Sequence, residues 1–160
     1  RMQSKKEFLD DIAMSLGGYV AEGMVFGDIT TGPSNDLQVA TALARDMVTK
    51  YGMSEKMGPI ALEGAGGKTL FGRGLNEKEY SESVGAQIDA EVSKIMNDAF
   101  AKARAVLMEY RKTLDAIAAK LMEAETIERE DFEKLLVLNG IAPKKGEEEK
   151  VVEEVEKRIV

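Results

Sequence analysis

An apolar stripe that follows Ser81 is the feature that most constrains the fold of this 160-residue chain. Its members recur in steps of three and four over about 30 residues, which is the spacing of one face of an α-helix. A helix of that length with a narrow apolar seam has to pack against other helices, so a mainly α-helical bundle is predicted. The stripe comprises Val84, Ile88, Val92, Ile95, Ala99, Ala103, Val106 and Tyr110.

Shorter patterns on both sides of the stripe predict further helices. Phe8, Ile12 and Leu16 recur every fourth residue before the Gly17–Gly18 pair, which interrupts a helix that residues 19–26 continue. A second helix is expected between an N-cap at Ser34 and Gly52, and Ser81 is expected to cap the long one. The pattern then continues with Leu114, Ile117 and Leu121 after a bend, and with Phe132, Leu135, Leu136 and Leu138 before Asn139–Gly140.

A glycine-rich segment, residues 53–80, separates the second and third expected helices. Its two short apolar pieces, residues 59–62 and 69–71, are expected to form extended loop or short β segments. Within it, residues 64–69 (GAGGKT) end like a phosphate-binding loop, but Leu62 stands where such a loop needs its first glycine. A glycine-rich loop is therefore the better interpretation, and ATP binding by this chain is not expected.

The domain organisation is expected to be simple. Residues 1–142 are predicted to form one helical domain, and residues 143–160 a linker with a charged tail or helix. The chain begins with Arg1 almost directly in a helical pattern, which suggests a fragment of a longer protein. No apolar run approaches the roughly 20 residues that cross a bilayer, so this segment is not expected to insert into a membrane.

The charge and the residue types exclude several function classes. The net charge is -7, and phosphate binding requires lysine and arginine, so nucleic acid is not an expected partner. The chain contains no cysteine, which excludes a thiolate zinc site and a cysteine nucleophile. It also contains no histidine, which excludes the usual serine triad. The nine methionines are expected to fill irregular gaps beneath the loops.

Three carboxylates surround the loop before the second helix: Glu22, Asp28 and Asp36. Carboxylates are hard oxygen ligands, but zinc sites usually add imidazole or thiolate donors. The residues alone therefore leave two interpretations of Asp36 open, and the favoured one is a first-turn carboxylate stabilised by the helix dipole. Metal ligation is the other.

An ordered series of short matches extends the interpretation, because it resembles the FtsH family of ATP-dependent, membrane-anchored zinc proteases. The resemblance covers roughly residues 3–140, and its most specific part is Gly17–Ser54. The matches are residues 16–22 (LGGYVAE), 26–27 (FG), 30–37 (TTGPSNDL), 40–41, 44–45, 47–48, 51–54 (YGMS), 70–73 (LFGR), 80–81, 88–89, 91–92 and 125–127 (ETI).

The resemblance implies roles for two carboxylates. In that family an upstream His-Glu-x-x-His motif supplies two zinc ligands and the general base, and an aspartate that matches Asp36 is the third ligand. Glu22 matches a glutamate that orients a zinc-bound histidine. The next family position is usually a second glutamate, whereas this chain has Gly23. No catalytic residue is expected within the chain itself.

The function implied by the resemblance is part of an ATP-dependent zinc metalloendopeptidase that degrades unfolded or membrane proteins. Zinc belongs to the intact enzyme and ATP to an ATPase module outside this chain, so the isolated chain is expected to bind neither and to be inactive. Protein substrates and hexameric self-association are implied, with the parent in a membrane and its protease domain in the cytoplasm or an organelle matrix, stroma or intermembrane space. The alternative is a non-catalytic helical scaffold derived from the family, which Gly23 and the missing histidines favour.

Overall fold

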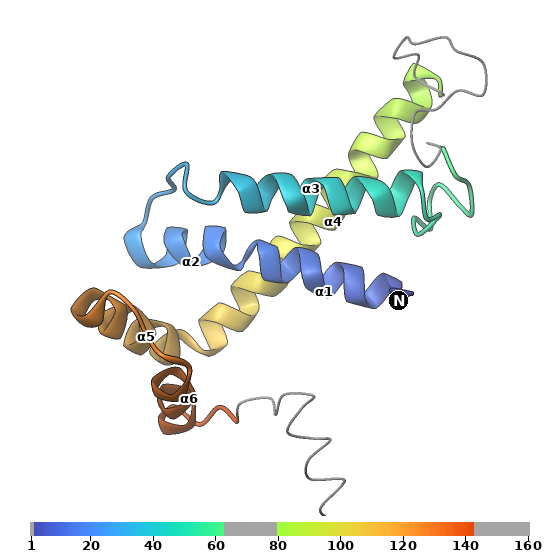
Figure 1. Cartoon of the computed structure of the whole chain (residues 1–160). Coiled ribbons are helices and arrows are strands. Elements are labelled where there is room, and N and C mark those ends of the chain that lie inside the picture. The colour runs from blue at the N-terminus through green and yellow to red at the C-terminus, as the bar shows by residue number, and fades with distance from the viewer. Residues whose placement is uncertain (1, 63–79, 143–160) are drawn as a thin grey trace, which may run out of the picture. The chain divides into compact units, whose positions relative to one another are not determined.

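The computed structural model describes residues 2–62 and 80–142, and within these it contains six helices. The chain divides into two compact units, Arg1–Glu109 and Tyr110–Val160. The first unit contains α1 (Lys5–Ser15), α2 (Gly17–Phe26), α3 (Ser34–Thr49) and α4 (Glu82–Glu109), and the second contains α5 (Arg111–Ala124) and α6 (Arg129–Leu138) (Figure 1). The predicted mainly helical fold is confirmed for the described residues.

The first two helices are separated next to the Gly17–Gly18 pair, where the sequence predicts an interruption. Ser4 and Glu7 form a capping box at the start of α1, with the Glu7 N–H donating to Ser4 Oγ at 3.2 Å and the Ser4 N–H donating to Glu7 Oε2 at 2.7 Å. The chain bends at Leu16, and α2 begins at Gly17. Helix α2 ends at Gly27, whose φ of +68° is the left-handed conformation that favours glycine.

The start of α3 differs by one residue from the prediction. Ser34 was expected to be the N-cap, but it is the first helical residue, and Pro33 occupies the cap without a side-chain hydrogen bond. The Ser34 N–H donates instead to the Thr31 carbonyl at 3.1 Å. The tight turn at Pro33 therefore sets the helix start.

The described part of the connection between α3 and α4 contains turns rather than strands. The short β alternative for residues 59–62 is not found, since the chain there is irregular and the Leu62 N–H donates to the Thr49 carbonyl at 2.7 Å. The apolar piece at 69–71 and the loop at 64–69 lie outside the described residues. Helix α4 then starts as predicted, because Ser81 Oγ accepts the Val84 N–H at 3.3 Å.

The core of the first unit lies where α1, α3 and α4 pack on one another, while α2 packs mainly on α4. Figure 1 shows α1 and α3 side by side, with α4 crossing both. The buried core cluster comprises Phe8, Ile12, Ala13, Leu16, Ala40, Ala44, Met47 and Ala99. Half of this cluster consists of alanines, which lets the helices approach closely.

The second unit, as far as it is described, contains two helices, and α5 packs against α6. The predicted stop after Leu138 is confirmed, because Gly140 adopts a φ of +79° and its N–H donates to the Val137 carbonyl at 3.0 Å. None of the helices in the described ranges combines the length and apolarity needed to span a bilayer.

Candidate functional site

Glu22 anchors the loop that connects α2 with α3. Its Oε1 accepts the backbone N–H of Thr30 at 2.9 Å. The loop continues this network, since Thr30 Oγ1 accepts the N–H of Gly32 at 3.1 Å. A side chain at position 32 would crowd the Thr30 hydroxyl, because a Cβ of Gly32 would lie 3.3 Å from Thr30 Oγ1. Glu22 therefore fixes the backbone of the loop that leads into α3.

Asp36 lies in the first turn of α3, where the helix dipole favours a carboxylate. Its Oδ2 lies over Gly18 of α2, at 3.9 Å from the position that a Cβ of Gly18 would occupy. Gly18 and Glu22 are four residues apart and so share one face of α2. The structure thus brings both predicted site residues to the same face of α2.

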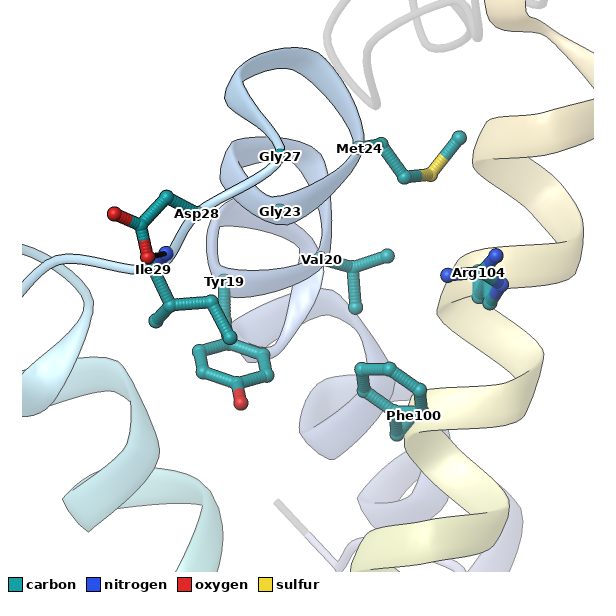
Figure 2. Close-up of a pocket in the computed structure, with 9 residues that line it drawn as sticks. All are labelled: Tyr19, Val20, Gly23, Met24, Gly27, Asp28, Ile29, Phe100 and Arg104. Carbon is teal, nitrogen blue, oxygen red and sulfur yellow. Dashed lines mark hydrogen bonds between the residues drawn. The ribbon is translucent and has the colours of Figure 1, made fainter.

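The third carboxylate of the loop has a different environment. Asp28 Oδ1 accepts the N–H of its neighbour Ile29 at 2.7 Å. Figure 2 shows the Asp28 carboxylate turned outward, away from α4. Asp28 therefore serves as a local cap of the loop.

The residues of this chain do not by themselves fit a zinc site. The described ranges contain no group of three or more histidine, cysteine, aspartate or glutamate side chains placed to hold a metal ion. Histidine and cysteine are absent from the sequence. The two carboxylates on the α2 face offer oxygen donors only, whereas protein zinc sites normally include nitrogen or sulfur donors. The ligand role of Asp36 stays a prediction.

A cavity of about 300 Å³ lies on the neighbouring face of α2, between this helix and α4 (Figure 2). Gly23 lines it, and the nearest atom to a Cβ built there, outside its own helix, is Ile29 Cγ1 at 3.8 Å. Packing therefore gives no reason for a glycine at this position. The sequence did not indicate this cavity, because Phe100 and Arg104 of its α4 wall are about 80 residues away along the chain.

Replacing Glu22 with alanine is expected to free the loop. Loss of one hydrogen bond to a carboxylate costs on the order of 1 kcal/mol, so amide exchange at Thr30 should accelerate by about fivefold to tenfold. NMR-detected hydrogen exchange on the chain measures this rate. Glu22→Gln, which keeps an acceptor oxygen, is the matched control and should leave most of the protection. Equal exchange in the alanine variant and the unaltered chain would show that Glu22 is not the anchor.

Comparison with known proteins identifies the family of this chain. Residues 1–135 match the family described as peptidase family M41. The ATP-dependent zinc metalloprotease FtsH of Alkalihalophilus pseudofirmus is 43% identical over 142 residues, which cover 88% of this chain and 21% of the relative. The protein of the same name from Bacillus subtilis is 41% identical over 146 residues, 90% of this chain and 23% of the relative.

A third relative gives the same result. The ATP-dependent zinc metalloprotease FtsH 3 of Synechocystis is 40% identical over 142 residues, 87% of this chain and 23% of the relative. The chain thus spans about a fifth of the length of the curated relatives it matches. A family match over most of the chain and this level of identity carry the assignment: the chain belongs to peptidase family M41, the family of FtsH-type zinc metalloproteases.

Proposed function

We propose that this chain is the helical part of the peptidase domain of an ATP-dependent zinc endopeptidase, and that Asp36 contributes one ligand to its zinc. The observation that supports this most is the placement of Asp36, in the first turn of α3 and over Gly18 of α2. A carboxylate at the start of a fixed helix is well suited to metal binding, because its position is set by rigid elements. The other ligands and the general base come from residues outside this chain.

Glu22 has a supporting part in this proposal. Through its hydrogen bond to the Thr30 N–H it fixes the loop that ends at the start of α3, and so it fixes the position from which Asp36 extends. This is a positioning role that acts through the backbone. It adds to the role that the resemblance implies, in which the same carboxylate orients a zinc-bound histidine.

The proposal extends to the whole protein that contains this chain. Its relatives are named ATP-dependent zinc metalloproteases, which supports zinc as its metal and ATP hydrolysis as the energy source for degradation. We propose that it acts on unfolded or membrane proteins, assembles as a hexamer and is held in a membrane by segments outside this chain. The chain alone, without imidazole or thiolate donors, is inactive.

Metal removal tests this function. Casein cleavage by the whole protein in the presence of ATP is expected to fall to background after treatment with 1,10-phenanthroline and to return when zinc is added. The isolated chain should neither cleave casein nor retain zinc on dialysis. Unchanged thermal unfolding of the treated protein would show that the loss reflects the metal and not denaturation.

The alternative function, a non-catalytic scaffold, is favoured by the absence of histidine from the chain and by Gly23 beside Glu22. A scaffold has no chemical need to keep a carboxylate over Gly18. Zinc-free whole protein that cleaves no casein under any condition would establish the scaffold. Chelator-resistant cleavage would overturn the zinc proposal.

A further inference from the structure

The cavity between α2 and α4 has a mainly apolar wall. One side is formed by α2 and the loop after it, and the other side by α4 (Figure 2). A volume of about 300 Å³ is at the lower end of small-molecule sites. Its apolar lining residues are Tyr19, Val20, Met24, Ile29 and Phe100.

Arg104 of α4, in the cavity lining, is a cation that has no carboxylate partner in the part of the chain that the structure describes. The acidic residue in the lining, Asp28, accepts the N–H of Ile29 and turns its carboxylate outward, away from α4 (Figure 2). A guanidinium beside apolar walls is a recognition group for a carboxylate.

Gly23 contributes to the open space of the cavity, because it lines the wall without a side chain. A side chain at this position would enter the cavity, since the nearest obstacle to its Cβ is Ile29 Cγ1 at 3.8 Å. Glycine inside a helix costs about 1 kcal/mol relative to alanine. The glycine that leaves this part of the cavity open therefore lowers the stability of α2, and packing gives no reason for it.

We propose that this cavity binds a small apolar carboxylate of about ten non-hydrogen atoms, with its apolar part between α2 and α4 and its carboxylate on Arg104. The proposal depends on residues of this chain alone and not on zinc or proteolysis. A neighbouring cavity of about 310 Å³ provides an internal comparison, because it shares Tyr19 and Phe100 but its lining has no charged side chain. Tyr19 and Phe100 form an edge-to-face pair, with ring centroids 6.1 Å apart.

An NMR titration of the isotope-labelled chain with 3-phenylpropionate and with the neutral 3-phenylpropionamide tests the proposal. The acid is expected to bind in the millimolar range, as its size allows, and to shift the Gly23, Gly27 and Ile29 amides. The amide should bind at least about fivefold more weakly, because it lacks the charge that Arg104 recognises. No saturable shift at these amides up to about 10 mM acid would overturn the proposal.

Two variants locate the site. Arg104→Gln should weaken binding of the acid by at least about fivefold, whereas Arg111→Gln, which removes a cation from the other unit, should leave it unchanged. Gly23→Leu should abolish binding by filling the cavity, and Gly17→Leu in the same helix, where nothing lies within 4 Å of the built Cβ, should not. NMR spectra of each variant without ligand should show that it is folded. Equal binding of acid and amide, or unaltered binding in both Arg104→Gln and Gly23→Leu, would refute the site.

Discussion

Replacing Asp36 with asparagine in the whole protein is expected to reduce zinc content and casein cleavage together, with cleavage lowered by at least about 100-fold. Loss of residues that only support a metal ligand already costs 10–100-fold as a rough guide, and an uncharged amide oxygen is a much poorer zinc ligand than a carboxylate. The fold should remain intact. Asp36 is exposed in the first turn of α3, so removing its charge costs at most about 1 kcal/mol of helix stability.

Asp28→Asn is the matched control for this experiment. Asp28 is also exposed and belongs to the loop before α3, but its carboxylate caps the Ile29 N–H and does not lie over Gly18. Zinc content, measured by atomic absorption, and the cleavage rate should be retained in this variant. Full activity of Asp36→Asn would mean that another carboxylate holds the metal. Loss of both zinc and activity in Asp28→Asn would point to loop disruption rather than ligand loss.

The helices of this chain could be predicted because their apolar residues repeat at helical spacing and their ends carry local signals. Ser4 and Ser81 cap α1 and α4 with hydrogen bonds that involve residues only three positions away. Gly140 ends α6 through its own conformation. Such signals act within one turn of the chain, so a sequence pattern suffices to locate them. Ser34 shows the limit, since Pro33 sets the start of α3.

Parts of the apolar stripes are not buried as the pattern suggested. Ile88, Ala99 and Ala103 of α4 are buried, but Val106 is exposed. Tyr51 was expected on the apolar face of the second helix, but it lies beyond α3, which ends at Thr49. Tyr51 is half exposed, yet it stacks on Phe8 with the ring centroids 5.4 Å apart. Periodicity identifies the face of a helix, whereas burial depends on how far the neighbouring helices extend along it.

The candidate site was only partly predictable. Asp36 and Glu22 were identified through the family resemblance, and the spacing of Gly18 and Glu22 places both on one face of α2. The hydrogen bond from the Thr30 N–H to Glu22 was not predictable, because it depends on the backbone course of the loop. Arg104 was missed for a different reason. It approaches the cavity from α4, and no local pattern links residues so far apart in the chain.

Two of the methionines do not fill gaps beneath loops, contrary to what the sequence analysis predicted for this residue type. Met47 of α3 is 0% exposed and belongs to the core cluster where α1, α3 and α4 meet. Met14 of α1 is 74% exposed. One residue type therefore occupies opposite environments within the same unit, and the sequence around each shows only that both lie on helices.

This contrast gives the largest expected effect on stability. Met47→Ala is expected to destabilise the chain by about 2–5 kcal/mol, because it removes buried apolar atoms and leaves a cavity that three packed helices fill only in part. The neighbouring core residues Ala40 and Ala44 are already small, so they have no side chains that can move into the space. Urea unfolding monitored by circular dichroism at 25 °C, with the transition of the first unit analysed separately, measures the change.

Met14→Ala is the matched control, since the same atoms are removed from the same unit at an exposed position. Its free energy of unfolding should stay within about 0.5 kcal/mol of the unaltered chain. A similar small change for Met47→Ala would mean that α3 is not packed between α1 and α4 as described. In that case the position of Asp36 over Gly18 would lose its support as well, because the core that holds α3 in place also sets where its first turn lies.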